Sequence, residues 1–224
     1  MNTRQRLRRS LVAQFHHPTG VGGHAAGWIM SHRPSNLARN RWAVDLLDIQ
    51  PDERVLELGC GPGVALAAIA ERVVAGVAVG VDHSPVMIRH ARRRNAAAVA
   101  AGRVQLVCAA VEDVLPADRN NEVVPTDLVR VNQPFDAVLA VNSIGFWDQP
   151  EQRLGTLRDL IHAGGRIALI SQPRCPGATA ETSRAAGSEL ATLLDKARYA
   201  GITVATLDLD PPAVCVRATV TQRH

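Results

Sequence analysis

A glycine-rich segment at residues 55–63 is the part of the sequence whose residue types point most directly to chemistry. It reads Val-Leu-Glu-Leu-Gly-Cys-Gly-Pro-Gly, so an apolar run leads into Gly59, Gly61 and Gly63. Glycines at such a turn let the backbone bend sharply and approach a ligand without a clash from Cβ atoms. Dinucleotide-binding proteins use similar glycine turns, so the spacing alone leaves that class open.

Three neighbouring residues favour a cationic ligand over a phosphate. The dinucleotide pattern places its third glycine or alanine where this chain has Val64. Pro62 has no backbone N–H to offer to a pyrophosphate. Glu57 places a carboxylate two residues before the turn, where it repels phosphate and attracts an ammonium or sulfonium group. A nicotinamide-dependent oxidoreductase is therefore the least favoured interpretation.

Asp82 is a second acidic residue in a favourable place, since it ends the next apolar run 25 positions after Glu57. An acid at the end of a second strand can accept hydrogen bonds from both hydroxyls of a ribose. Taken alone, Asp82 could instead be a charge at the N-terminus of the following helix. Together with the glycine turn it predicts ribose binding.

The elements that must position these residues alternate between strand and helix patterns. Strands are expected at residues 54–58, 77–82, 104–108, 137–141 and 166–171, and helices at residues 36–47, 64–73, 84–101, 152–162 and 181–199. Ser84 and Pro85 form a favoured helix start. Gly164 and Gly165 are expected to cap the helix before them. Such alternation implies a mostly parallel sheet that is covered on both faces.

The end of the chain departs from this alternation. Apolar runs at residues 202–207 and 213–220 are joined by Asp210, Pro211 and Pro212. A connection this short joins antiparallel neighbours. The predicted fold class is therefore α/β, a Rossmann-like doubly wound seven-stranded sheet that is mostly parallel with an antiparallel final strand.

Domain organisation follows from the same patterns. A basic tail and a glycine-rich N-terminal cap segment are expected at residues 1–34, and one domain at residues 35–224. Residues 113–133 show no clear periodicity, and they are expected to be an inserted loop because connections of this length are uncommon inside compact domains.

Composition limits the classes of partner. The net charge is +4, but four arginines in the first nine residues supply it, and the other 215 residues hold 21 basic and 21 acidic residues. A basic tail on a neutral body does not predict nucleic-acid binding. No apolar run approaches the roughly 18 residues of a membrane span. The four cysteines are widely spaced, which is typical of reduced thiols, so we expect a cytoplasmic protein. A monomer or a homodimer is expected.

Three motifs together resemble the class I S-adenosylmethionine-dependent methyltransferases of the small-molecule type 11 style. They are VLELGCGPG at residues 55–63, GVDHS at residues 80–84 and FDAVLAVNSIGFW at residues 135–147. Residues 15–42 also resemble the N-terminal cap of small actinobacterial methyltransferases. The resemblance covers residues 54–171, and the closing strand pair extends it to the C-terminus. It implies that residues 35–224 are a class I methyltransferase domain with S-adenosyl-L-methionine as methyl donor.

The resemblance also implies a set of cofactor-binding residues. They are Glu57, Gly59, Gly61, Gly63, Asp82, His83, Glu112 and Asn142. Glu57 and the glycines would surround the methionine part, Asp82 would hold the ribose, and His83 would flank the adenine.

The third-strand motif differs from the pattern of the family. Many members bind the adenine amino group with an acid that follows a small residue, whereas this chain has alanines at 109 and 110. Glu112 or Asp113 is expected to take that role. Asn142, at the end of the fourth strand, is expected to contact the methionine amino group and the acceptor, and a turn-forming asparagine is the alternative.

The activity that the resemblance implies is methyl transfer to an O, N or C atom of a small-molecule acceptor. The alternatives are a methyltransferase of RNA or protein, and a non-catalytic regulatory protein that binds the cofactor. No spacing of histidines and carboxylates predicts a metal site. The catalytic residues stay open, and the candidates for a general base are His16, His17, His24 and His32.

Aromatic residues are scarce, and four of them fall in segments expected near the pocket. They are Trp28, Trp42, Phe146 and Trp147. They are expected either to wall the acceptor site and shield a sulfonium by cation–π contact, or to pack in the core.

Overall fold

The computed structural model describes residues 33–115 and 134–221. Its strands are β1 (Arg54–Leu58), β2 (Val77–Asp82), β3 (Val104–Cys108), β4 (Phe135–Val141), β5 (Ile161–Ser171), β6 (Ala200–Leu207) and β7 (Ala213–Thr219). Its helices are α3 (Pro34–Leu46), α4 (Val64–Ala70), α5 (Pro85–Arg94), α6 (Ala96–Ala100), α7 (Val111–Val114), the 3₁₀ helix η2 (Ile144–Phe146), α8 (Pro150–Asp159) and α9 (Ala180–Lys196).

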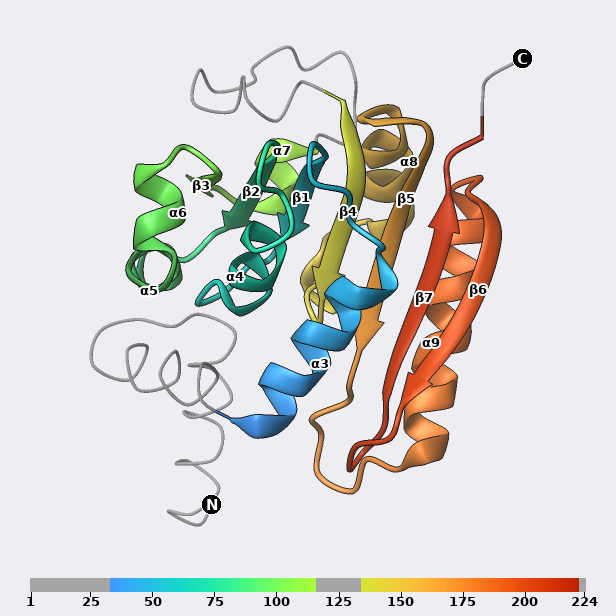
Figure 1. Cartoon of the computed structure of the whole chain (residues 1–224). Coiled ribbons are helices and arrows are strands. Elements are labelled where there is room, and N and C mark those ends of the chain that lie inside the picture. Colours follow the sequence, from blue (N-terminus) through green and yellow to red (C-terminus); the bar gives the residue numbers. More distant parts are fainter. Residues whose placement is uncertain (1–32, 116–133, 222–224) are drawn as a thin grey trace.

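The strands form one seven-stranded sheet in the order β3-β2-β1-β4-β5-β7-β6, with helices on both faces (Figure 1). Strands β1 to β5 pair in parallel, and β7 runs antiparallel to both β5 and β6. The predicted fold class is confirmed. The strand order reverses between β1 and β4, and ligands of open α/β sheets bind outside the carboxyl ends of the strands at such a point.

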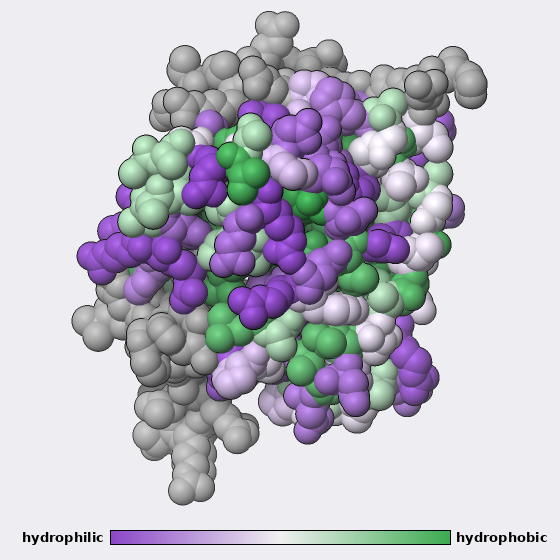
Figure 2. All heavy atoms as spheres, in the orientation of Figure 1, coloured by the Kyte–Doolittle hydropathy of each residue, from purple (hydrophilic) through white to green (hydrophobic). Residues whose placement is uncertain are grey.

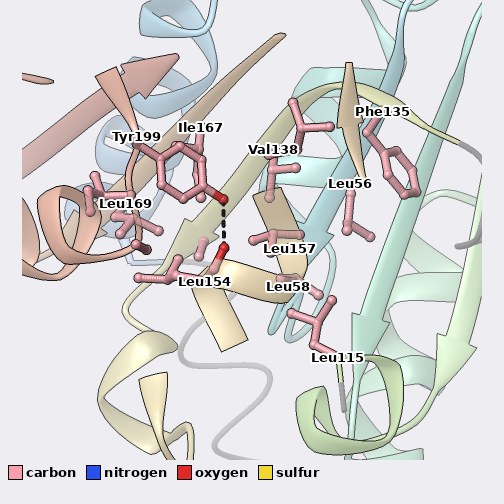
Figure 3. Packing of buried hydrophobic residues seen from close by; sticks show 14 of the residues in the cluster. Leu56, Leu58, Leu115, Phe135, Val138, Leu154, Leu157, Ile167, Leu169 and Tyr199 are labelled. Carbon is pink, nitrogen blue, oxygen red and sulfur yellow. Dashed lines mark hydrogen bonds between the residues drawn. The ribbon is translucent and has the colours of Figure 1, made fainter. Parts of the chain in front are cut away.

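Two clusters of buried apolar side chains, one on each face, hold the layers together. Leu56 and Leu58 of β1 belong to the cluster that includes α8 and α9, whereas Val55 belongs to the cluster that includes α3 and α4. This alternation follows from the period of two in a strand, and it explains why a strand that is covered on both faces has an almost continuous apolar sequence. Figure 3 shows the first cluster, in which the Tyr199 hydroxyl donates to the Leu154 carbonyl oxygen at 3.1 Å.

The helix α3 packs against α4, and it begins near the carboxyl ends of β4 and β5 (Figure 1). Hydrophilic and apolar side chains are interspersed on the face that Figure 2 presents. No helix in the two described parts of the chain is both long enough and apolar enough to cross a membrane.

The sequence-based prediction was wrong at the end of α8. The helix ends at Asp159, and β5 begins at Ile161, so Gly164 and Gly165 lie in a strand and do not cap a helix. Strand pairing is the physical reason: the Gly164 nitrogen donates to the Val220 oxygen at 2.7 Å, and the Val220 nitrogen donates to the Gly165 oxygen at 2.9 Å.

Other predicted element boundaries differ less from those of the structure. The helix expected at residues 84–101 is divided at Asn95 into α5 and α6, while Ser84 caps α5 as predicted by accepting a hydrogen bond from the Met87 nitrogen. The start of the loop expected at residues 113–133 was wrong, because Asp113 belongs to α7. Residues 116–133 and 1–32, with Trp28 and the four candidate histidines, lie outside the described residues.

Candidate cofactor site

The glycine turn follows β1 and opens α4. Gly59, Gly61 and Gly63 all have positive φ angles, of 76°, 52° and 73°, which is the left-handed region that favours glycine. A Cβ atom at Gly59 would lie 2.4 Å from the Ser143 Cβ, and one at Gly63 would lie 2.6 Å from the Asn95 Nδ2. A Cβ at Gly61 would meet no heavy atom within 4 Å. Two of the glycines therefore allow close packing, and Gly61 borders open space.

Backbone and side-chain hydrogen bonds fasten this turn to the end of β2. The backbone nitrogens of Gly59 and Cys60 both donate to the Val81 oxygen, at 2.8 and 2.9 Å. The Asp82 carboxylate accepts from the Gly61 nitrogen at 2.8 Å through Oδ2. A carboxylate has about four acceptor positions, so Asp82 retains capacity for a ligand hydroxyl.

Two carboxyl groups lie within electrostatic range of each other at the turn. Glu57 is 2 % exposed, and its burial, followed by the charge of Asp82, raises its pKa well above the ordinary value. Its Oε2 has no hydrogen-bond partner among the described residues. Burial also raises the pKa of Asp82, although hydrogen bonds from Ser84 and Gly61 and the charge of His83 oppose that shift.

No lysine or arginine in the described parts of the chain forms a salt bridge with either carboxyl group. The exposed side chain of His83 places its Nδ1 3.8 Å from the Asp82 Oδ1. A buried carboxylate without a cationic partner is costly, so the turn offers a cationic ligand a favourable electrostatic environment.

The predicted adenine contacts lie beyond β3. Glu112 is on α7, and its Oε1 accepts a hydrogen bond from the Asp148 nitrogen at 2.9 Å, which connects α7 to the segment after η2. The alternative candidate, Asp113, accepts from the Ala110 nitrogen at 3.2 Å and so caps its own helix.

Asn142 joins the ends of β4 and β5. It has a φ of 53°. Its Oδ1 accepts from the Gln172 nitrogen at 2.7 Å, and its Nδ2 donates to the Gln172 oxygen at 3.4 Å. Asn142 thus has a left-handed backbone conformation just after β4, and its side chain is bonded to the backbone of Gln172, just after β5.

Sequence reasoning did not identify two polar residues that shape the turn. The Ser143 hydroxyl donates to the Leu58 oxygen at 2.7 Å, directly beside Gly59. The Asn95 amide donates to the Gly63 oxygen at 3.1 Å. The signal for Ser143 was its place just after a predicted strand; Asn95 carried no signal, because its contact depends on the packing of α5 against α4.

The aromatic residues divide between core and surface. Trp147 is 7 % exposed and belongs to the apolar cluster around α8 and α9, which is the core-packing alternative. Phe146 is 60 % exposed. Trp42 packs at the edge of the cluster around α3 and α4. Among the described residues, no three His, Cys, Asp or Glu side chains gather as a metal site would require.

Residues 56–167, half of the chain, match the family described as "Methyltransferase domain". The chain is 26% identical over 195 residues to "Uncharacterized methyltransferase YdaC" of Bacillus subtilis (strain 168), a match that covers 86% of this chain and 96% of that protein. It is 32% identical over 135 residues to "Aklanonic acid methyltransferase DauC" of Streptomyces sp. (strain C5), over 58% of this chain and 53% of that protein.

Solved structures show the same fold. The N-methyltransferase NodS from Bradyrhizobium japonicum WM9, in complex with S-adenosyl-L-homocysteine, superposes with a TM-score of 0.63 at 15% identity, over 99% of this chain and 100% of that one. The matched family segment contains the glycine turn, Asp82 and Asn142. The chain therefore belongs to the methyltransferase domain family, among the class I methyltransferases that use S-adenosyl-L-methionine as cofactor.

Proposed function

We propose that this protein transfers a methyl group from S-adenosyl-L-methionine to an O, N or C atom of a small-molecule acceptor. The observation that carries the proposal is the pair of buried carboxyl groups, Glu57 and Asp82, at a glycine turn where the described residues supply no lysine or arginine partner. S-Adenosyl-L-methionine brings positive charge on both its sulfonium and its ammonium group, so it matches this environment.

Glu57, Asp82 and Gly61 each have a distinct role in the proposal. Glu57 attracts the ammonium group, and its unpartnered Oε2 is the atom available for that contact. Asp82 accepts hydrogen bonds from the ribose with the acceptor positions that Gly61 and Ser84 leave free. Gly61 contributes the open space that a Cβ atom would narrow.

The remaining predicted residues act around this centre. His83 is exposed beside Asp82 and would flank the adenine. Glu112 would accept from the adenine amino group while it holds the Asp148 backbone. Asn142 would act by fixing the ends of β4 and β5, since its amide is hydrogen-bonded to Gln172 on both sides.

The sulfonium supplies an activated methyl group, and the protein contributes alignment. Methyl transfer is an in-line displacement, so the rate depends on holding the acceptor atom opposite the sulfur and on excluding water. The rigid turn serves this alignment because Gly59 and Gly63 are packed tightly against Ser143 and Asn95. An acceptor that must lose a proton also needs a base, for which His16, His17, His24 and His32 remain the candidates.

A small-molecule acceptor is supported by one relative and by the charge distribution. DauC is named for a single compound, aklanonic acid. The 215 residues after the basic tail hold equal numbers of acidic and basic residues, which does not favour a nucleic-acid acceptor.

Isothermal titration calorimetry of the full chain tests the donor part of the proposal. S-Adenosyl-L-methionine should bind, NADH should not, and Asp82→Ala should weaken the binding. Glu189→Gln removes an exposed carboxylate on α9 and serves as the matched control, which should bind as the wild type does. Binding of NADH without binding of S-adenosyl-L-methionine would overturn the proposal.

The acceptor part needs a separate assay. Fractionated metabolite extracts are incubated with methyl-labelled donor, and labelled small molecules are sought by mass spectrometry. A labelled protein or RNA in place of a labelled metabolite would favour the macromolecular alternative. Donor binding without any labelled product would favour a non-catalytic regulatory protein.

A further inference from the structure

Two arginines converge on one neutral oxygen at the end of β5. The Nη1 of Arg39, on α3, donates to the Gln172 Oε1 at 2.8 Å. The Nη2 of Arg174 donates to the same oxygen at 3.0 Å and to the Asn36 Oδ1 at 2.6 Å. The Gln172 Nε2 donates to the Pro211 oxygen at 2.8 Å, which fixes the orientation of the amide and directs its oxygen to the two guanidinium groups.

The positive charge at this point is not balanced by the described residues. Arg39 is 6 % exposed, and its Nε has no hydrogen-bond partner. Burial and then the charge of Arg174 lower the pKa of Arg39 to about 10, so it stays protonated at neutral pH. Burial and then the charge of Arg33, a third positive group, lower the pKa of Arg174.

Another arginine of the same protein, Arg166, has the carboxylate partner that Arg39 and Arg174 lack in the described part of the chain. Arg166, which lies on β5 itself, donates to both carboxylate oxygens of Glu53, at 2.8 and 2.6 Å. This is the usual arrangement for a partly buried arginine, because the planar guanidinium matches a carboxylate through two hydrogen bonds. Among the described residues, Arg39 and Arg174 form no salt bridge and share only the dipole of an amide.

The location of the pair relates it to the donor site. Gln172 is bonded through its backbone to Asn142 at the end of β4, and the next residue, Ser143, is bonded to the end of β1 beside the glycine turn. The carboxyl ends of β1 and β5 are separated by two strand spacings, or about 10 Å. Figure 1 shows α3, which carries Arg39, beginning near this edge of the sheet. An anion bound by the two arginines would thus lie within a small molecule's length of the donor.

We propose that Arg39 and Arg174 form an anion-binding site that holds a carboxylate group of the methyl acceptor. The inference rests on the proposed function and narrows its acceptor class to small molecules that carry a carboxylate. A carboxylate here would neutralise the two like charges and give the Arg39 Nε an acceptor, whereas Gln172 supplies only one uncharged oxygen. Arg174 is exposed, so the site is open to a ligand from solution.

The test uses citrate, a small tricarboxylate, as the probe. The full chain is first saturated with S-adenosyl-L-homocysteine, whose own carboxylate occupies the donor's place, and citrate is then titrated by calorimetry. Citrate should bind, and Arg174→Gln should weaken it by about tenfold or more, the equivalent of one charged hydrogen bond. Binding should also weaken as ionic strength rises.

Arg158→Gln is the matched control, because it removes the same charge from α8. Arg158 donates to the carbonyl oxygens of Ala197 and Arg198, away from the cluster, so citrate should bind this variant as it binds the wild type. A second variant, Gln172→Glu, places a built-in carboxylate between Arg39 and Arg174 and should abolish citrate binding.

The outcomes separate this inference from the proposed function. If S-adenosyl-L-homocysteine does not bind the wild type, the donor site itself is wrong. If it binds but citrate binds neither the saturated nor the free chain, or if citrate binds the wild type, Arg174→Gln and Gln172→Glu equally, the anion site is refuted. If citrate binds the free chain but not the chain saturated with S-adenosyl-L-homocysteine, the two arginines hold the donor's carboxylate, and the assignment to the acceptor is overturned.

Discussion

Asp82 holds the glycine turn in place, because its Oδ2 accepts a hydrogen bond from the Gly61 backbone nitrogen at 2.8 Å. Its Oδ1 accepts from the Ser84 nitrogen at 2.9 Å. One carboxylate thus fixes both the turn after β1 and the start of α5. The residue proposed to bind the ribose is also a structural support, so its substitution should affect both binding and stability.

Asp82→Ala should weaken the binding of S-adenosyl-L-methionine by about 1.5–3 kcal/mol, the range for charge-assisted hydrogen bonds. It should also lower the free energy of unfolding by about 1–3 kcal/mol, since the Gly61 N–H loses its acceptor. Calorimetry and urea unfolding measure the two effects. Ser84→Ala is the control, because it removes the cap of α5 but leaves the carboxylate. An affinity loss below about 0.5 kcal/mol would contradict ribose binding.

Glu57 should make the stability of the free protein depend on pH. Its pKa is raised in the folded state above the ordinary 4.5. The stabilisation from the protonated group is complete below 4.5 and declines as the pH rises towards the folded-state pKa, by at most about 1.4 kcal/mol per pH unit. Glu57→Gln lacks this decline. In urea unfolding, the free energy of unfolding of the variant should therefore rise relative to that of the wild type between pH 5 and pH 8. Parallel pH profiles would contradict the prediction.

Donor affinity should show the opposite pH dependence. The ionised form of Glu57 attracts a cation, so binding of S-adenosyl-L-methionine should strengthen as the pH rises through the raised pKa. Glu57→Gln should bind more weakly at pH 8 and lose most of this dependence. Calorimetry between pH 5 and pH 8 makes the comparison, and an affinity that is independent of both pH and the substitution would show that Glu57 does not face the ammonium group.

The sequence predicted the glycine turn after β1 because the signals for this turn are local. The bounds of β1, β2 and β3 were correct, since the strands of a parallel sheet that is covered on both faces read as largely apolar runs. The end of α8 was wrong because the pairing of Gly164 and Gly165 with Val220 is decided far along the chain. The contact between Arg39 and Gln172 joins residues 133 positions apart, and nothing in the local pattern of either one predicts it.

The glycines of the turn should separate packing from binding. Gly63→Ala places a Cβ 2.6 Å from the Asn95 Nδ2 and 2.9 Å from Ala91, at a φ of 73°, so it should lower the free energy of unfolding by more than about 2 kcal/mol. Gly61→Ala meets no protein atom and should cost only about 1–2 kcal/mol for its left-handed backbone.

Donor titration then distinguishes the two roles. Gly61→Ala should weaken the binding of S-adenosyl-L-methionine by tenfold or more, measured at a temperature where the variant is fully folded. The reason is that the added methyl group enters the open space beside Asp82. Gly61→Ala that binds like the wild type would show that the donor lies elsewhere.

Substitutions at Phe146 and Trp147 should also separate a role in core packing from a role in acceptor binding. Trp147 is 7 % exposed in the apolar core, and Trp147→Ala should cost about 3–5 kcal/mol of unfolding free energy. Phe146 is 60 % exposed just after the end of β4, and Phe146→Ala should change the unfolding free energy by less than about 0.5 kcal/mol. If Phe146 walls the acceptor site, the same substitution should raise the acceptor KM severalfold in the labelled-donor assay while donor affinity stays constant. Unchanged acceptor kinetics in Phe146→Ala would remove this residue from the site.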